Sequence, residues 1–291
     1  MKTKLFVLGL MACSMTMLGQ TDKKGSKREN WYFKVGASYF TQAAATEFPN
    51  VNGREPLKEV YVGGELVSKE SITGSFGEGF RYGGNAGYRF TDRLGIEMGI
   101  NYYKSKGKTM VETISDGVSV FKSDGQVTAL DVAPALVLYL GEVKGFEPYT
   151  KVGVIVPLNG RLEIETNAIA APGVKVFSRD KINPNITGGF LAALGTSYKL
   201  KDKLSAYAEV EYRNFTVHGK TKETTAFTIN GQNQLDTRTT AQIHTNYTDH
   251  LDSSSNNAEF NTVDSSRPTD DLSSYISISG VGLTLGLRYS L

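Results

Sequence analysis

The last sixteen residues of the chain, Ile276 to Leu291, alternate between two kinds of side chain with a period of two. From Val281 onward the odd positions are apolar or aromatic, and the even positions are small or polar. Successive side chains of a β-strand point to opposite faces, so this segment predicts a strand with one entirely apolar face. The fold must give that face an apolar environment along its whole length.

Seven earlier segments show the same alternation, and we expect each of them to form a strand. They are residues 31–40, 76–90, 94–103, 126–140, 146–157, 186–200 and 204–215. The connections between the eight segments are alternately long and tight. Within the long ones we expect hairpin turns at Gly63-Gly64, Asp116-Gly117 and Pro172-Gly173. The longest connection, 216–275, is rich in Thr, Ser and Asn.

Pro134 lies in the middle of the fourth segment. Proline has no N–H to donate to a strand ladder, so a closed sheet needs a bulge or a lost hydrogen bond at this position.

The composition fits one all-β domain. The 291 residues include 31 Gly, 15 Tyr and 14 Phe, which suits many short strands better than long helices. We assign residues 31–291 to this domain and residues 21–30 to a short polar tail. The formal charge of +2 disappears if Lys2 and Lys4 are removed with a signal peptide, and nothing in the sequence indicates nucleic acid binding.

Residues 1–20 have the layout of a secretory signal peptide. Two lysines precede an apolar stretch, 5–18, and cleavage is expected after Gly19 or Gln20. The stretch is shorter than the roughly 20 residues that a transmembrane helix needs, and no later segment approaches that length. We therefore expect no helical membrane span.

The single cysteine, Cys13, lies inside this stretch. Its surroundings partly resemble a lipoprotein processing box, but Met11 is atypical and the apolar run continues through Leu18, as ordinary signal cleavage requires. Ordinary cleavage is the favoured interpretation, and lipidation of Cys13 stays open.

The two faces of the strands distinguish a membrane barrel from a soluble one. Small side chains and charges of both signs suit the narrow interior of an eight-stranded barrel, and rows of Phe, Tyr and Leu suit lipid. A lipocalin-like barrel would place the apolar rows inside. We therefore predict an all-β fold, an eight-stranded antiparallel up-and-down transmembrane β-barrel with short turns and long loops. The charged residues expected in its lumen are Lys34, Arg81, Glu97, Asp131, Lys151, Glu209, Glu211, Arg213 and Arg288.

Aromatic residues gather at both ends of the apolar rows, as in the interfacial girdles of membrane barrels. Toward the tight turns they are Phe33, Tyr88, Phe90, Phe146, Tyr198 and Tyr289. Toward the long loops they are Tyr39, Phe76, Phe80, Tyr102 and Tyr212.

Over residues 31–291 the chain resembles the small eight-stranded outer-membrane barrels that include the OmpA transmembrane domain, OmpX and OmpW. The spacing of Thr284, Gly286, Tyr289 and Leu291 also resembles the C-terminal signal that the barrel-assembly machinery recognises, although an aromatic last residue is commoner there. The resemblance implies a place in the cell outer membrane of a Gram-negative cell, with surface-exposed extracellular loops and both termini periplasmic. It also implies outer-membrane lipid and the assembly machinery as partners.

The expected lumen charges have two interpretations: a network of ion pairs that fills the barrel, or the lining of a solute pathway. We favour the network, because buried charges are normally paired. The eighth strand of a closed barrel lies beside the first and the seventh. We therefore expect Arg288 or Lys34 to find an acidic partner without crossing the lumen.

All three histidines, His218, His244 and His250, lie in the longest connection. Their spacing matches no metal-ligand pattern, so we expect no metal and no cofactor. His218 is expected near the outer lipid boundary. Some barrels that resemble this one in outline modify lipid A with a histidine at that rim, so an enzyme stays an alternative.

The prediction for function is a non-enzymatic outer-membrane barrel that acts in surface interaction, adhesion or envelope integrity. Its extracellular ligand or surface partner is unknown. A narrow conduit for small solutes and a lipid A-modifying enzyme are the two alternatives. No residue is assigned a catalytic or cofactor-binding role.

Overall fold

The computed structural model describes residues 30–185 and 187–291. The predicted signal peptide, Cys13 and nearly all of the predicted tail lie outside the described residues. No helix in the described ranges is long and apolar enough to cross a membrane.

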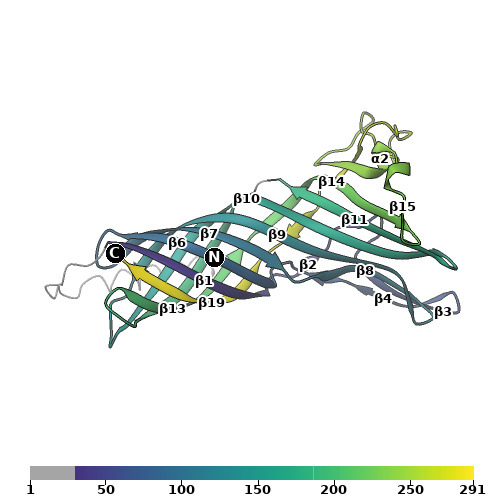
Figure 1. The fold of residues 1–291 in the computed structure, drawn as a ribbon. Helices are drawn as coiled ribbons and strands as arrows, with labels where there is room; N and C mark the ends of the chain where they lie inside the picture. The colour runs from purple at the N-terminus through teal and green to yellow at the C-terminus, as the bar shows by residue number, and fades with distance from the viewer. Residues whose placement is uncertain (1–29, 186) are drawn as a thin grey trace, which may run out of the picture.

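Eight antiparallel strands close into a barrel (Figure 1). They are β1 (Trp31–Gln42), β6 (Gly79–Arg89), β7 (Leu94–Ser105), β9 (Val118–Tyr139), β10 (Phe146–Ala171), β12 (Gly189–Lys199), β13 (Leu204–Asn214) and β19 (Gly280–Ser290). Each strand pairs with the next in this order. The last strand pairs with the first, with Lys34 opposite Arg288 and Val35 opposite Leu287. The predicted barrel is therefore confirmed.

The alternation of the sequence separates the inside of the barrel from the outside. On β1, the Lys34 side chain is 2% exposed, whereas Val35 beside it is 62% exposed. The exposed outer face continues around the barrel through residues such as Leu194 and Leu285. An apolar belt thus surrounds a polar interior, as expected for a barrel in lipid.

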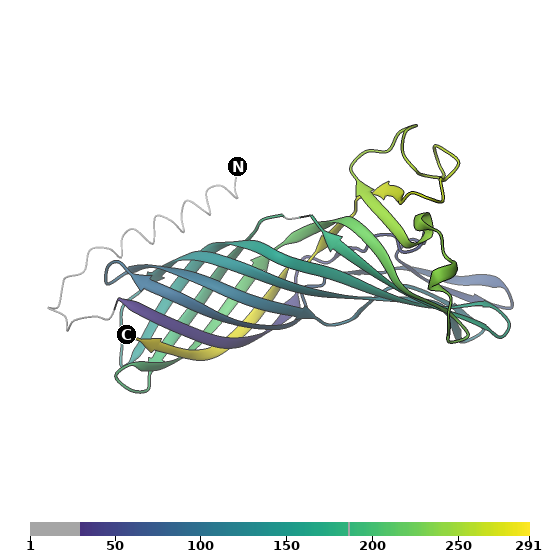
Figure 2. The same ribbon diagram turned by 45° about the horizontal axis from the view of Figure 1, so that its top comes forward.

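Beyond one end of the barrel, part of the sheet continues as a long extension (Figures 1 and 2). Its spatial order is β4, β3, β8, β9, β10, β11, β14, β16 and β17. The strands added to β9 and β10 are β3 (Leu57–Val62), β4 (Glu65–Ser71), β8 (Lys108–Ser115), β11 (Val174–Pro184), β14 (Thr216–Ile229), β16 (His244–Thr248) and β17 (Thr269–Leu272). The short elements are β2 (Thr46–Glu47), β5 (Thr73–Gly74), β15 (Gln232–Asn233), η2 (Leu235–Thr237), α2 (Thr240–Ile243) and β18 (Tyr275–Ser277).

We call this side of the molecule the loop end and the opposite side the turn end. At the turn end the backbone of Leu291 bonds to Trp31, so the two ends of the barrel chain lie together.

More of the long connections is folded into strands than the sequence predicted. The hairpin turns at Gly63-Gly64, Asp116-Gly117 and Pro172-Gly173 lie where predicted, each with a positive φ at its glycine. However, β9 begins eight residues before its predicted start at Gln126, and β10 runs on to Ala171. The expected loop after residue 215 begins with β14. In these stretches apolar side chains such as Phe121, Leu162 and Ile164 are buried on the inner face and polar side chains lie on the outer face. This is the reverse of the belt strands, so the pattern that predicted those strands does not extend into them.

Two predictions at the loop end were wrong. Phe76 is not part of an aromatic girdle: it is 0% exposed and lies in an apolar core, because β6 begins only at Gly79. The predicted strand 276–291 is two strands, β18 and β19. Of these, β18 pairs with β14.

Pro134 is accommodated without a shift of register. It lies opposite Met98 on β7 in an unbroken ladder. On its other side, β9 pairs with β10, and there the ladder is interrupted between the pairs Gly153–Ala135 and Val156–Val132. The register is the same before and after this interruption. The cost of the proline is thus lost pairing, one of the two outcomes expected, and the register shift in β10 lies instead between Pro157 and Asn159.

Candidate functional site

The lumen of the turn half contains two lysines that share two glutamates. Lys34 Nζ lies 2.7 Å from Glu97 Oε1 and 2.8 Å from Glu209 Oε1. Lys151 Nζ lies 2.8 Å from the second oxygen of Glu209 and 3.5 Å from that of Glu97. All four side chains are buried. The group is neutral, which offsets the large cost of removing each charge from water.

Two arginines extend the network toward the loop end. Arg81 donates two hydrogen bonds to Glu211, at 2.7 and 3.0 Å. Arg213 donates to Asp131 at 2.8 Å, and the Asn101 amide donates to the same carboxylate oxygen at 3.0 Å. The two parallel bonds from the Arg81 guanidinium fix the Glu211 carboxylate in place as well as neutralising it.

At the turn end two further arginines hold one carboxylate. Arg89 and Arg288 donate to the two oxygens of Glu147 at 2.7 and 2.9 Å. Arg89 also stacks on the Tyr139 ring, 3.7 Å from its centroid. Arg89 and Glu147 were absent from the predicted lumen set, although both stand at inward positions of their strands. The alternation of inward and outward positions along each strand would have been enough to add both residues to the predicted set.

The pairs do not follow strand adjacency: Arg288 reaches its acidic partner across the lumen, whereas Lys34 finds partners only one strand beyond its neighbours. Arg288 of β19 meets Glu147 of β10, on the other side of the barrel. Lys34 of β1 meets Glu97 of β7 and Glu209 of β13, each separated from β1 by one strand. Long side chains reach across because an eight-stranded barrel is only wide enough for side chains to fill it.

Tyrosines fill the space left between the charges. Tyr32 donates to Glu97 at 3.0 Å and accepts from Tyr139 at 2.7 Å, and Tyr149 donates to Glu209 at 2.7 Å. All three rings are buried. Two small cavities border the network, of about 20 and 30 Å³, and each has room for only one or two water molecules.

The loop half of the interior is apolar instead. Phe76, Met110 and Ile155 are buried in one cluster with residues from the long connections and from the inner faces of β9, β10 and β11. Phe48 packs against Phe76 with tilted rings whose centroids are 5.1 Å apart, and the Tyr103 hydroxyl donates to the Phe76 carbonyl at 2.6 Å. The barrel interior therefore changes from ionic to apolar along its axis.

Comparison with known families agrees with this architecture. The family model described as "Outer membrane protein beta-barrel domain" matches residues 10–248. The chain belongs to this family. The barrel is thus a protein of the cell outer membrane. No curated protein matches it.

Among solved structures the barrel is similar to several small outer-membrane proteins. The neisserial surface protein A shares 12% identity, with 91% of this chain and 100% of that chain covered and a TM-score of 0.41. OprG from Pseudomonas aeruginosa shares 14% identity, with coverage of 93% and 99% and a TM-score of 0.44. Ail, the attachment invasion locus protein of Yersinia pestis, shares 10% identity, with coverage of 91% and 99% and a TM-score of 0.35.

The histidines of the outer-membrane barrel lie apart in the extension. His218 packs against Tyr275 with 5.2 Å between ring centroids, and its Nδ1 lies 3.5 Å from the Asn185 side-chain amide nitrogen. His250 is exposed near Asp252, and His244 is the first residue of β16. Within the described ranges, no three His, Cys, Asp or Glu side chains are placed to hold a metal ion.

The residues of the predicted C-terminal signal divide between the two faces of β19. Thr284 is buried and lies 2.7 Å from the Ser38 hydroxyl, whereas Tyr289 and Leu291 are exposed on the outside. Gly286 is required by close packing: a Cβ there would lie 2.2 Å from the Val35 carbonyl oxygen. Recognition of this segment by the assembly machinery stays a prediction.

Proposed function

We propose that the protein is a non-enzymatic outer-membrane barrel that binds a partner at the cell surface through its loop-end extension. One observation carries the proposal: ion pairs and tyrosines fill the lumen, while the long connections are folded into a sheet well beyond the barrel. A closed lumen argues against a solute conduit. The folded extension lies beyond the lipid-facing belt, so its surface is available to bind a partner.

The proposal includes an orientation, with the loop end outside the cell and both termini in the periplasm. Short periplasmic turns and long outer loops are the rule in bacterial outer-membrane barrels. Outer-membrane lipid and the assembly machinery are then its partners within the envelope.

Protease accessibility on intact cells tests this orientation. Glu259 and Phe260 lie on an exposed segment between β16 and β17, so we expect proteinase K to cleave there. The turns at Asp92, Lys144 and Lys203 should stay intact until the outer membrane is opened. Cleavage of the turns with protection of the 249–268 segment would reverse the orientation.

The tips of two adjacent hairpins are the best candidate for the contact surface. The β3–β4 turn is joined to the β8–β9 turn because Gly63 N–H donates to the Asp116 carboxylate at 2.8 Å. Four large apolar side chains around these turns are exposed to solvent: Val62, Leu66, Val67 and Val118. Exposed apolar groups on an ordered surface commonly mark a protein contact.

Adherence of cells that express the protein tests the surface role. Expression in a non-adherent laboratory strain should raise adherence to epithelial monolayers. Val67→Ser combined with Val118→Ser should return adherence to the level of the empty vector. Ile169→Ser, at the separate β10–β11 tip, is the matched control and should retain adherence.

Two results would replace the proposal. Resolved conductance steps in planar bilayers, with adherence unchanged by expression, would indicate a conduit. A change in the mass of lipid A on expression would indicate an enzyme.

A further inference from the structure

The barrel wall has a gap between β10 and its neighbours at the base of the extension. The ladder from β10 to β12 ends at Ile155–Gly189, and the ladder from β10 to β11 begins at Leu162–Ile182. Residues 156–161 therefore have no ladder pairs on this side among the described residues, although β9 still pairs with them on the other side.

The local sequence explains why the gap stays open. Pro157 on one side and Pro184 on the other have no N–H to donate. Two residues of the neighbouring segment bond to β14: Asn185 N–H donates to the His218 carbonyl at 2.8 Å, and the Thr187 hydroxyl donates to the Thr216 carbonyl at 2.6 Å.

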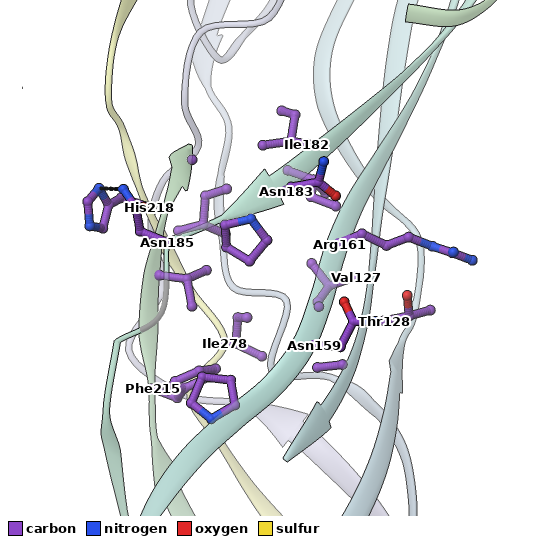
Figure 3. A pocket seen from close by; sticks show the side chains of 18 of the residues that line it. Val127, Thr128, Asn159, Arg161, Ile182, Asn183, Asn185, Phe215, His218 and Ile278 are labelled. Carbon is purple, nitrogen blue, oxygen red and sulfur yellow. Dashed lines mark hydrogen bonds between the residues drawn. The ribbon is translucent and has the colours of Figure 1, made fainter. Parts of the chain in front are cut away.

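A pocket of about 320 Å³ lies in this gap (Figure 3). Its inner wall consists of buried apolar side chains: Val127, Leu162, Ile182, Phe215, Val217 and Ile276. The volume is roughly twice the 150 Å³ of an engineered apolar cavity that takes up benzene. The pocket is thus large enough for a chain of several carbon atoms.

The mouth of the pocket meets the apolar belt of the barrel. Val154 and Val156 on β10, which come just before the lining residue Pro157, are exposed belt residues. Leu158, which is 56% exposed, lines the pocket itself, and Tyr275, 64% exposed, packs on the lining residue His218. Lipid in contact with the belt is therefore continuous with the pocket mouth.

The polar groups around the mouth are mostly neutral. Asn159, Asn183 and Asn185 line it with amides. Arg161 leads away from the pocket in Figure 3, and its Nε lies 2.8 Å from Glu163, so its charge is already paired. By contrast, the hollow of about 600 Å³ on the other side of Ile182 and Ile276 is lined by charged groups that include Asp180, Lys222 and Asp271.

We infer that this pocket binds the hydrocarbon chain of a free single-chain amphiphile that enters from the membrane, with a hydroxyl head group held by the asparagine amides. Apolar burial supplies the affinity, and the amides orient the head. The pocket is a binding site and not a passage, because the ionic network closes the lumen below it. The inference needs only the pocket and the lipid belt, so it does not depend on the surface role proposed above.

Photolabelling in liposomes tests the inference. The probe is dodecanol with a diazirine at the end of its chain. Mass spectrometry should find the label on the strands that line the pocket, around residues 157–162 and 182–184. Unlabelled dodecanol should compete for the site much better than hexanol.

A substitution that fills the pocket gives the sharper test. Gly160 lines the pocket, and a Cβ there would meet only ordinary contacts at 3.5 Å or more. Gly160→Phe should therefore be tolerated and reduce labelling by about tenfold or more, a loss of about 1.4 kcal/mol of binding free energy. Ala170→Phe, on an exposed part of the same strand, is the matched control and should leave labelling unchanged.

A second variant covers the case in which Gly160→Phe fails to fold. Ile278→Ala enlarges the pocket at a partly buried side chain and should shift the competition in favour of tetradecanol over dodecanol.

Three outcomes would overturn the inference. Labelling spread evenly around the belt and indifferent to both pocket substitutions would mean that the gap is ordinary lipid surface. Equal competition by benzyl alcohol would indicate a site for soluble aromatics. Preferential labelling by a phospholipid with the diazirine on one acyl chain would make a membrane lipid the occupant.

Discussion

The two halves of the barrel interior are filled by different kinds of side chain. In the turn half, inward positions carry Lys34, Glu97 and their partners, and every charge has an opposite charge within reach. In the loop half, inward positions carry residues such as Ile155, and segments outside the eight barrel strands supply Met110 and Phe76 as filling. Ion pairs close the first half, and an apolar core of the kind found in soluble proteins closes the second.

The difference follows from what surrounds each half of the barrel. Lipid surrounds the turn half, so apolar side chains there gain nothing by turning inward, and the polar ones must satisfy each other. Much of the loop half projects beyond the belt, so burying apolar side chains inside it is favourable in the ordinary way. On the outside of the extension, β4 is exposed along its whole length and carries Lys and Glu there.

The largest expected effect is the loss of one carboxylate from the ionic half. Glu97→Ala leaves Lys34 and Lys151 partly unpaired in a buried site, and breaking such a pair costs about 3–5 kcal/mol. The variant should lose its resistance to heat unfolding in detergent, measured by the gel mobility of unboiled samples. Glu165→Ala, which removes an exposed partner of Arg179 in the extension, is the control and should cost about 1 kcal/mol at most.

One result would show that the charges of the turn half form a solute pathway and not a closed network. If the wild type conducts in resolved steps, and Glu97→Ala alters ion selectivity while unfolding at the same temperature, these charges line a pore.

The next effect concerns the belt. Leu285→Arg places a cation on the exposed face in the middle of β19, where it should cost roughly 2–4 kcal/mol, and far less near the interface. We expect Leu285→Arg to impair assembly much more than Ser290→Arg, measured as folded protein in purified outer membranes. Equal losses would contradict the assignment of inside and outside.

The smallest effect lies at the junction of the two halves. Glu78 accepts hydrogen bonds from Lys108, from Tyr39 of β1 at 3.0 Å and from Lys106 at 3.2 Å. The Lys108 hydrogen bond, followed by the other two, lowers the pKa of Glu78 to about 2. Because this pKa lies below its ordinary value of 4.5, the stabilisation is complete above pH 4.5 and is lost as the pH falls toward 2.

Glu78→Gln should therefore lower thermal stability slightly at neutral pH, by less than about 1 kcal/mol, as expected for a surface pair. The difference from the wild type should shrink between pH 4.5 and pH 2, measured by circular dichroism in detergent. A difference that stays constant over this range would mean that the carboxylate charge contributes nothing to the junction.

The sequence by itself determined the eight strands of the belt, their inward and outward faces and three hairpin turns. Period-two alternation is local, and lipid demands it of every strand in contact with it. The same reasoning placed Lys34, Glu97 and the other predicted charges inside.

Only the tertiary structure decided which charges meet, because partners such as Arg288 and Glu147 are brought together by the curvature of the barrel and the stagger of its strands. It also decided that the loop half has an apolar core, since Phe76 and Ile276 join that core from connecting segments without any periodic pattern. The gap at Pro157 and Pro184 was likewise invisible in the sequence. A proline can lose its ladder bond harmlessly, as Pro134 does, whereas Pro157 and Pro184 lie on the two sides of one seam and both line the pocket there.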